Sequence, residues 1–403
     1  MTRRARVFYI GMITSDAYGR AIGEQTYAGA AARKMILVVR ALRSVGHRAI
    51  VVSLPFVGVG ARRRSYGTVT TTEGGVPAVF LATLRSRYLR KLFGPFVLAG
   101  FAWRRVGRQD TAIVYNHAIE YLPALVLLRL KGARIVQDIE DAPTADETGA
   151  RGVLNRLSFA VTSALTVRRK MVVADHVARE LGLADYVVVR GVASHETDGL
   201  DPDATKWDDL RSGQALRIHY GGTLIGETGV DLFCAAVARL AKDADRLARP
   251  VCFAVTGVGE LDKIRGLQGR MQGCVKVDVT LRPELVKADY LALLDSCHAS
   301  LSLKRPGSGM ANTTFPSKVI EITASGLALV STRLGDVAEI FDAHSAIFLA
   351  GYEPADLADA IVEMACNPEM VGRVARVGQE VCVATFSPES VGHEMTRLCE
   401  RKR

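Results

Sequence analysis

Two side chains of opposite charge stand three positions apart in the segment 312–341, and their types suit a ligand. Lys318 and Glu321 should project from one face of a helix, because residues three apart are neighbours there. A helix N-terminus offers free N–H groups and partial positive charge, to which Lys318 adds a full charge, and this suits a phosphate. A carboxylate one turn deeper suits ribose hydroxyls. The alternative is a surface ion pair worth a few tenths of a kcal/mol.

The residues around this pair predict the elements that position it. Thr313 and Thr314 are N-cap candidates, the helix should run over 317–325, and Gly326 should end it. The apolar run 327–331 is typical of a central parallel strand. The segment is therefore predicted to form half of a nucleotide-sugar site.

Apolar runs alternate with helical stretches along the chain, which predicts an α/β protein built from βαβ units and parallel sheets. A helix is expected over 30–45, and a loop with a hairpin over 61–82. The chain is expected to be helical in three pieces after Pro354. The predicted strands are 6–11, 48–54, 111–115, 134–139, 171–174 and 186–190, then 216–221, 251–256, 274–279, 299–303, 327–332 and 346–349.

A change of composition at 196–214, which is acidic and rich in turn-forming residues, predicts a linker between two domains. The first domain is expected over 1–195 and the second over 215–382. Residues 383–403 should form a terminal helix that could pack back on the first domain. Two doubly wound domains leave a cleft between the carboxyl edges of their sheets, where ligands of such sheets bind.

The charge of the chain is divided unequally. Its net charge is +10, but residues 1–110 carry 19 Lys and Arg against 4 Asp and Glu, whereas the rest carries 33 against 38. Apolar residues make up 49% and charged residues 23%, as in a soluble globular protein. Seven scattered cysteines without a CxxC pair argue against a disulfide framework and a zinc site, and no signal peptide is predicted.

The segment 92–103 is uncharged, contains aromatic residues and Pro95, and has basic clusters on both sides. Twelve residues cannot span a bilayer as a helix, which needs about 20. The pattern favours a segment lying at an anionic membrane surface, on the inner face of the cell membrane with the protein in the cytoplasm. A buried helix with basic ends is the alternative. Nucleic acid is not expected, since no nucleic-acid-binding motif accompanies the charge.

The order of elements resembles that of retaining glycosyltransferases of the GT-B fold, family 4 (group 1), which have two Rossmann-like domains. The first domain resembles the family at 32–53, which contains Gly46-His47, and at Val188-Val-Arg-Gly-Val. The second resembles it at Tyr220-Gly-Gly-Thr-Leu, Gly229-Val-Asp-Leu, Phe315-Pro-Ser-Lys-Val-Ile-Glu and Ala324-Ser-Gly. Thr256-Gly-Val-Gly-Glu resembles the Gly-rich turn of the family's second domain. The terminal helices resemble it at Asp356-Leu-Ala-Asp-Ala-Ile and Thr385-Phe-Ser.

This resemblance implies a hexosyltransferase that moves a sugar from a nucleoside diphosphate sugar to a lipid-linked or other cell-envelope polysaccharide acceptor, with retention at the anomeric carbon. No metal or cofactor is implied. It places His117 at the sugar, Lys318 near the diphosphate and Glu321 on the ribose. Further donor contacts are expected at Gly222, Thr223, Gly257, Gly259, Lys304, Thr313, Thr314 and Ser317.

The chain departs from the family pattern at three polar positions. Thr313 stands where the family has the first glutamate of its E-x7-E pattern, and Thr223 and Thr228 replace a basic pair. Lys304 or Arg305 could supply the missing charge. A non-catalytic protein that binds a nucleotide or a partner, and a sugar-nucleotide epimerase, therefore remain alternatives.

Some residues of the first domain have a role open between substrate contact and structure. Gly11 and the loop 12–18 should face the acceptor and the leaving group. Asp138, Glu140 and Asp141 follow a strand and could serve the acceptor or cap a turn. The other seven histidines show no metal-ligand spacing and are expected to be structural. The sugar, the base and the acceptor are not determined by these motifs.

Overall fold

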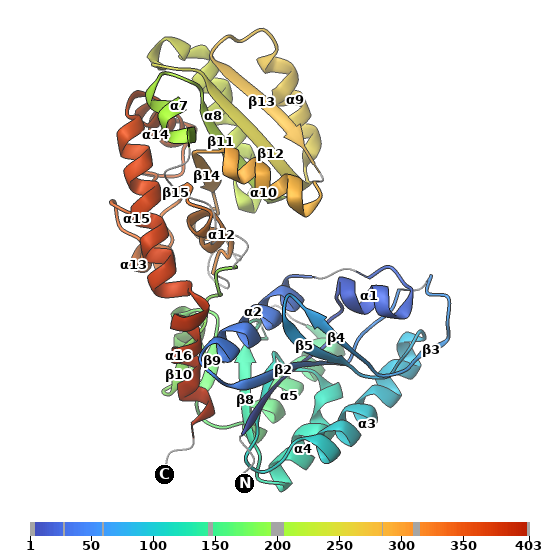
Figure 1. Cartoon of the computed structure of the whole chain (residues 1–403). Helices are drawn as coiled ribbons and strands as arrows, with labels where there is room; N and C mark the ends of the chain where they lie inside the picture. The colour runs from blue at the N-terminus through green and yellow to red at the C-terminus, as the bar shows by residue number, and fades with distance from the viewer. Residues whose placement is uncertain are drawn as a thin grey trace. The chain divides into compact units, whose positions relative to one another are not determined.

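The computed structural model describes residues 5–26, 29–58, 60–143, 148–194, 205–283, 285–308 and 315–400. The chain divides into two compact units. Figure 1 draws the chain coloured from blue at the N-terminus to red at the C-terminus. Unit 1 comprises Met1–Val192 and Ser387–Arg403, and unit 2 comprises Ala193–Phe386. Thus the C-terminal segment returns to the first unit.

Unit 1 is built on an eight-stranded sheet in which every pair but one is parallel. Its order is β10-β9-β8-β7-β1-β2-β5-β4. The six predicted strands are confirmed to within two residues at their ends. The strands are β1 (Arg6–Gly11), β2 (Arg48–Ser53), β4 (Val69–Glu73), β5 (Val76–Phe80), β7 (Thr111–Tyr115), β8 (Arg134–Ile139), β9 (Lys170–Val172) and β10 (Tyr186–Val188).

The predicted hairpin is the antiparallel pair β4–β5, joined by Gly74 and Gly75 at φ 50° and 82°. Positive φ at both turn positions is what a tight hairpin requires, and glycine adopts it without steric cost. A separate two-stranded sheet pairs β3 (Ser65–Tyr66) with β6 (Thr83–Leu84).

Alternate residues of β1 point to opposite faces of the sheet, and each face is covered by helices. Val7 and Tyr9 belong to a core shared with α2 (Ala30–Ser44) and α16 (Pro388–Cys399). Phe8 and Ile10 belong to a core shared with α3 (Arg87–Arg105) and α4 (Leu122–Leu130). Unit 1 is therefore a three-layer α/β/α structure, as the continuous apolar strands predicted. The remaining helices are α1 (Asp16–Ile22), η1 (Ile119–Tyr121), α5 (Gly149–Leu165) and α6 (Asp175–Glu180).

Helix α3 contains the uncharged segment 92–103 and continues through Pro95. It buries Leu98, Ala99 and Ala102, yet it leaves Phe96 67% and Trp103 57% exposed. The helix thus has one apolar face in the core and further apolar side chains in solvent. None of the helices in the described ranges is both long and apolar enough to cross a membrane.

The C-terminal helix packs on α2 within unit 1. The His47 Nε2 atom lies 3.0 Å from Thr396 Oγ1, and Arg134 donates a hydrogen bond to the carbonyl of Leu398. The predicted helix 383–403 starts later than expected: α15 (Pro368–Phe386) ends in unit 2, and α16 begins at Pro388. Ser387 caps α16 by accepting a 3.2 Å hydrogen bond from the N–H of Ser390, and proline favours the first helical position.

Unit 2 holds a six-stranded, wholly parallel sheet of order β13-β12-β11-β14-β15-β16. The six predicted strands are confirmed to within three residues at their ends. They are β11 (Leu216–Leu224), β12 (Val251–Gly259), β13 (Val277–Arg282), β14 (Ala299–Ser302), β15 (Ala328–Ser331) and β16 (Ile347–Phe348).

The helices of unit 2 cover both faces of this sheet. Tyr220 of β11 packs on Phe233 of α8 (Val230–Lys242), with ring centroids 4.6 Å apart. His219 of the same strand meets Tyr290 of α10 (Lys287–Ser296) on the other face, with ring centroids 5.7 Å apart. Besides α15, the described part of this unit also contains α7 (Thr205–Arg211), η3 (Gly226–Thr228), η4 (Ala244–Arg246), α9 (Leu261–Met271), α12 (Lys318–Ala324), α13 (Gly335–Ile340) and α14 (Pro354–Cys366).

The predicted linker 196–214 is not a linker over all its length. Residues 195–204 lie outside the described ranges, but α7 (Thr205–Arg211) is helical and belongs to unit 2. Trp207 and Leu210 are 5% and 0% exposed within the core of that unit. The burial of these two side chains explains why a polar, turn-rich segment ends in an ordered helix.

The packing of α16 on α2 depends on Gly392. A Cβ at this position would lie 2.1 Å from the carbonyl oxygen of Ala41. Gly392→Ala is expected to force the helices apart and lower the free energy of unfolding of unit 1 by about 1–3 kcal/mol. Gly100→Ala in α3 is the control, because a Cβ there meets nothing within 4 Å. Calorimetric unfolding measures both, and equal stability of the two variants would contradict this contact.

Candidate functional site

The carboxyl edge of the unit 2 sheet gathers the described donor residues predicted from the sequence. The chain leaves β11 toward β12 on one side, while β14 pairs with β11 on the other. A ligand of an open α/β sheet binds in the crevice at such a switch point. Gly222 and Thr223 end β11, Lys304 follows β14, and Lys318 begins α12.

The side chain of Lys318 crosses the backbone of β11 at Gly222. A Cβ built on Gly222 would lie 2.3 Å from Cε and 3.0 Å from Nζ of Lys318. Gly222 also has φ 113°, a conformation that residues with a side chain rarely adopt. Position 222 therefore requires glycine for two reasons, the positive φ and the space that the Lys318 side chain occupies. The missing side chain lets the ammonium group of Lys318 reach the end of β11.

His219 is a neutral residue close enough to Lys318 to be affected by its charge. The His219 ring is 1% exposed, with Nδ1 2.9 Å from Ser300 Oγ and Nε2 2.9 Å from Thr256 Oγ1. Burial, and secondly the charge of Lys318, lower the pKa of His219 to about 3. The imidazole is thus neutral at physiological pH, and the expectation that His219 is structural agrees with its place in the sheet.

Helix α12 provides less of an anion site than its sequence predicted. It has seven residues, and its N-cap is Ser317, whose side chain makes no capping hydrogen bond. The N–H groups of Val319 and Ile320 already donate to the carbonyls of Pro316 and Ser317, at 2.9 and 3.2 Å. The positive charge at this edge therefore comes mainly from the Lys318 side chain. Thr313 and Thr314, the predicted caps, lie outside the described residues.

Glu321 lies one turn into α12 and is half-buried. Across the described residues no ion pair joins it to Lys318, so the simple surface pair considered above is not formed. Both residues lie in the first turn of the same helix.

The glycines predicted as a ligand-binding turn are part of a strand. β12 continues through Gly257 and Gly259, which pair with Gly222 and Leu224 of β11. A Cβ on Gly257 would lie 1.9 Å from the Gly222 carbonyl oxygen, and one on Gly259 would lie 2.3 Å from that of Leu224. The expected turn was wrong, because close approach of the two strand backbones accounts for both glycines.

Lys304 is a second basic residue at this edge and, unlike Lys318, it is buried. It is 8% exposed, and burial lowers its pKa to about 8, with the charge of Glu227 acting in the opposite direction. Hydrogen bonds fix the backbone here. The carbonyl of Lys304 accepts a 2.7 Å hydrogen bond from Thr332 Oγ1, and the N–H of Arg305 donates a 2.8 Å hydrogen bond to the backbone carbonyl of Glu227.

The threonines that replace the family's basic pair differ in their environments. Thr223 is exposed. Thr228 closes the turn after β11, because its hydroxyl accepts a 3.0 Å hydrogen bond from the N–H of Ile225 and donates to the Thr223 carbonyl. The Thr228 side chain therefore has a local structural use.

In unit 1, His117 follows β7 at the carboxyl edge, and its ring packs against α5. Its Nε2 lies 2.8 Å from Asn155 Oδ1, and its ring meets Phe159 edge-on with centroids 5.2 Å apart. An amide oxygen only accepts, so Nε2 is the donor. Nδ1 is buried with no hydrogen-bond partner among the described residues.

The acidic residues after β8 are largely engaged inside unit 1. Lys34 of α2 forms ion pairs with Asp138, at 3.1 Å, and with Glu140, and the Tyr9 hydroxyl donates to Asp138. Burial by itself would lower the pKa of Lys34, but the charges of Asp138 and Glu140 outweigh it and raise the pKa. Burial raises the pKa of Glu140. Lys34 thus neutralises carboxylates that had been considered for the acceptor.

Asn116 joins the ends of β7 and β8 in a left-handed conformation, with φ 55°. Its side-chain oxygen accepts from the N–H groups of Glu140 and Asp141, at 2.7 and 3.0 Å. Sequence analysis missed Asn116 and Lys34. Asparagine tolerates positive φ, so Asn116 before His117 offered a local signal; Lys34 offered none, because its partners lie more than 100 positions away.

The segment after β1, expected as an open loop over 12–18, is shorter and tied down. The Ser53 hydroxyl accepts a 2.9 Å hydrogen bond from the N–H of Ile13, and α1 starts at Asp16. A Cβ on Gly11 would lie 2.5 Å from Met35 Sδ, so glycine lets α2 pack at the end of β1. All seven cysteines are free, and the described residues contain no cluster of three His, Cys, Asp or Glu able to hold a metal.

Comparisons with known proteins agree with this geometry. Residues 215–367 match the family described as group 1 glycosyl transferases. The Anabaena protein HepE in complex with UDP has a TM-score of 0.63 at 12% identity, over 97% of this chain and 98% of its own. A Rickettsia africae glycosyltransferase has a TM-score of 0.62 at 11% identity, over 98% of each chain. The E. coli trehalose-6-phosphate protein bound to UDP-2-fluoro glucose has a TM-score of 0.63 at 12% identity, over 99% of this chain and 100% of its own.

No curated protein matches the chain in sequence. At these identities the solved structures establish the fold, and the architecture of two Rossmann-like domains predicted from the sequence is confirmed. The family match covers only residues 215–367, the segment that contains β11, Lys304 and α12.

If Lys318 must cross Gly222 to reach the ligand, a methyl group at Gly222 should displace it. Gly222→Ala is expected to weaken UDP binding by about tenfold or more, which corresponds to about 1.4 kcal/mol. Gly266→Ala is the control, since Gly266 lies within α9 and a Cβ there meets nothing within 4 Å. Isothermal titration of both variants measures the effect, and unchanged affinity in Gly222→Ala would remove Lys318 from the site.

The lowered pKa of Lys304 predicts a pH dependence of nucleotide binding. Below about pH 8 the side chain is charged, and above it the charge is lost. A diphosphate is fully ionised there, since phosphate monoesters have a second pKa of about 6. UDP affinity should therefore fall as the pH rises from 7.5 to 9.5. Lys304→Arg keeps its charge and should flatten the profile; a flat profile in the unaltered protein would exclude Lys304 as a diphosphate contact.

Proposed function

We propose that this chain, in which residues 215–367 match the group 1 glycosyl transferases, moves a sugar from a nucleoside diphosphate sugar to a lipid-linked or other cell-envelope polysaccharide acceptor, with retention at the anomeric carbon. The observation that carries this proposal is the Lys318 side chain laid across Gly222 at the switch point of the unit 2 sheet. It lies within the segment that matches the family.

The chemistry required of this edge is stabilisation of a leaving diphosphate. The bond between the anomeric carbon and the β-phosphate oxygen breaks, the acceptor oxygen bonds to that carbon, and the acceptor's proton is released. Negative charge grows on the diphosphate, where Lys318 and Lys304 stabilise it electrostatically. We propose that these side chains take this role in place of a metal ion.

Uridine diphosphate sugars are the first donors to test, because two proteins of the same fold are described with UDP or a UDP-sugar analogue. In the proposed complex, Glu321 binds the ribose and Thr223 and Ser317, both exposed, contact the phosphates. Thr313 and Thr314 precede the same helix and keep their predicted donor role.

The acceptor is assigned to unit 1. His117 at the carboxyl end of β7 is proposed to contact the transferred sugar. Its Nδ1 has no hydrogen-bond partner among the described residues, which supports a polar ligand on this side. The basic residues of α3 beside exposed apolar side chains support a position at the inner face of the cell membrane. The net charge of +15 over residues 1–110 fits an anionic lipid surface.

Turnover of UDP-glucose and related donors is the direct test, with lipid phosphates and glycans as acceptors. The purified chain should release UDP when the correct acceptor is present, and EDTA should leave the rate unchanged. Lys318→Ala should lower kcat by about 100-fold, as loss of one preorganised donor to a developing anion does. Lys242→Ala, an exposed lysine of α8, is the matched control.

The membrane assignment has a separate readout. The chain should sediment with anionic vesicles at low salt and remain in solution with neutral ones. Failure to sediment would contradict peripheral binding and leave the transfer reaction standing.

A second candidate function is nucleotide binding without transfer. The hydroxyl of Thr228 is used inside its own turn, so this substitute for a family cation has no evident ligand role. UDP binding with no turnover over a broad acceptor panel would favour this function. Conversion of the donor with no acceptor present would instead indicate a sugar-nucleotide epimerase.

A further inference from the structure

Unit 1 contains a cavity of about 410 Å³ at the carboxyl edge of its sheet. Three strands around the switch point contribute to it: Met12 follows β1, Leu54 and Pro55 follow β2, and Glu120 lies after β7. Helix α3 forms another wall. The cavity therefore lies where an open α/β sheet binds ligands, and its volume is that of a small-molecule site, about 300–1,000 Å³.

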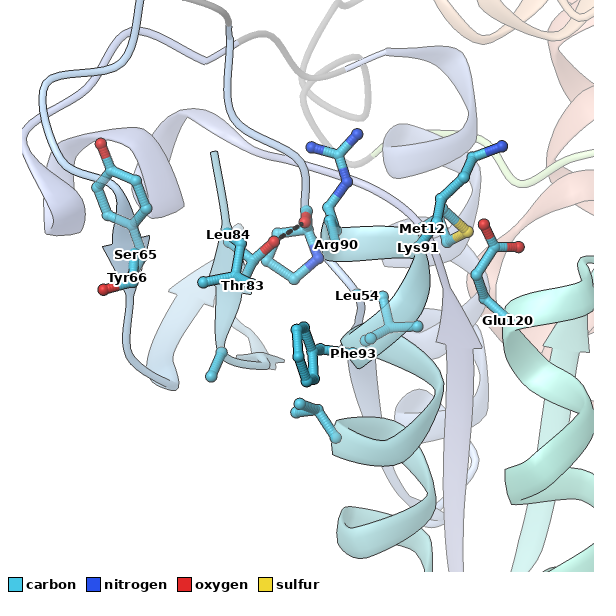
Figure 2. A pocket seen from close by; sticks show the side chains of 14 residues that line it. Met12, Leu54, Ser65, Tyr66, Thr83, Leu84, Arg90, Lys91, Phe93 and Glu120 are labelled. Atoms are coloured by element: carbon cyan, nitrogen blue, oxygen red, sulfur yellow. Dashed lines mark hydrogen bonds between the residues drawn. The ribbon is translucent and has the colours of Figure 1, made fainter. Parts of the chain in front are cut away.

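The walls of this cavity are mostly apolar. Figure 2 shows the ring of Phe93 and the side chain of Leu54 on its walls, and Thr83 directs its hydroxyl to the carbonyl of Pro55 at 2.7 Å. The Thr83 hydroxyl is therefore already engaged. The other lining residues are Ser65, Tyr66, Ala82, Leu84, Gly94 and Val97. An apolar ligand fits such walls, because water there gains few hydrogen bonds.

Two cations stand at the same cavity. In Figure 2 the charged ends of Arg90 and Lys91 extend in one direction, away from the ring of Phe93. Neither forms an ion pair with a carboxylate in the part of the chain that the structure describes, although Glu120 lies near enough to act on Arg90 electrostatically. Apolar walls with adjacent cations are complementary to a molecule that has an apolar chain and an anionic group.

The cavity is continuous with the exposed apolar surface of α3. Phe93 is 50% exposed and also lines the cavity, and its neighbours Leu89, Leu92 and Phe96 are 47%, 60% and 67% exposed. Large apolar side chains gathered in solvent indicate an interaction surface. Because Phe93 belongs to both, this surface adjoins the cavity and would give an alkyl chain an apolar route into the protein.

We propose that this cavity binds the hydrocarbon chain of a lipid-phosphate acceptor, with Arg90 and Lys91 on its phosphate. The proposal rests on the glycosyltransferase function above and assigns its acceptor to a chemical class, an amphiphile with an alkyl or prenyl chain. It also explains why the basic and aromatic residues of α3 occur together.

Direct binding of a soluble probe tests the cavity independently of catalysis. Decyl phosphate, used as monomer, should bind the full chain with an affinity at least tenfold higher than decanol or methyl phosphate, measured by isothermal titration. If decanol binds equally well, or if methyl phosphate does, recognition of chain and phosphate together is overturned.

Two glycines of α3 provide a matched pair of variants. Gly94 lines the cavity, and a Cβ there would lie 3.8 Å from Leu54 Cδ2, an ordinary contact, so the helix can accept a side chain. Gly94→Leu should fill the cavity and weaken decyl phosphate binding at least tenfold. Gly100→Leu adds the same side chain where a Cβ meets nothing within 4 Å, and should bind as the unaltered protein does. Both replacements favour the helix.

The cations have their own pair of variants. Arg90→Gln should reduce binding of decyl phosphate about tenfold, the effect of losing one charged hydrogen bond, and leave that of decanol unchanged. Arg104→Gln, in the last turn of α3 and outside the cavity lining, should change neither. Equal losses in both variants would indicate general attraction to basic surface and overturn the site.

The transfer reaction separates failure of this inference from failure of the function. With a lipid-phosphate acceptor, Gly94→Leu should raise the KM for the acceptor and leave UDP binding unchanged. Turnover that is unaffected by Gly94→Leu would overturn the acceptor site and keep the transferase. Specific binding of decyl phosphate without turnover of any donor would overturn the transferase function and keep the lipid-phosphate site.

Discussion

The contact of Lys318 with Gly222 is the constraint on which unit 2 depends. A lysine ammonium can reach the end of β11 only if no side chain stands there, and Gly222 satisfies this with φ 113°. Its neighbour strand meets the same demand, because Gly257 must lack a Cβ to approach the Gly222 carbonyl. The glycines thus act together: they let two strands and one lysine converge, which brings a positive charge to the switch point of the sheet.

The two sheets solve the problem of charge in opposite ways. In unit 1, Asp138 and Glu140 would leave buried negative charge at the end of β8, but Lys34 from α2 pairs with both. Paired charges are tolerable inside a protein where single ones are not. Arg90 and Lys91, which form no ion pair within the described residues, stand instead beside an apolar cavity that Glu120 also lines. In unit 2, Lys304 is buried with its pKa lowered to about 8, so its charge responds to pH near neutrality.

Much of the fold could be predicted from local pattern. Apolar runs bounded by glycine and polar residues predicted twelve strands, all of which occur, and the helix expected over 30–45 is α2 (Ala30–Ser44). Prediction was weaker where a side chain finds its partner far along the chain. Trp207 turned part of a predicted linker into helix, and β12 extended through glycines expected to form a turn. In both cases packing against another element outweighed the local preference of the segment.

The sequence by itself determined the α/β architecture with two Rossmann-like domains, the helix that carries Lys318 and Glu321, and the basic nature of the first domain. These follow from periodicity, charge and residue type, which are local properties. Tertiary structure alone decided that Lys318 crosses Gly222, that Lys34 neutralises Asp138, and that Met12, Leu54 and Phe93 enclose one cavity. Each of these contacts joins residues distant in the chain, and their separation in space is set only when strands pair and helices pack.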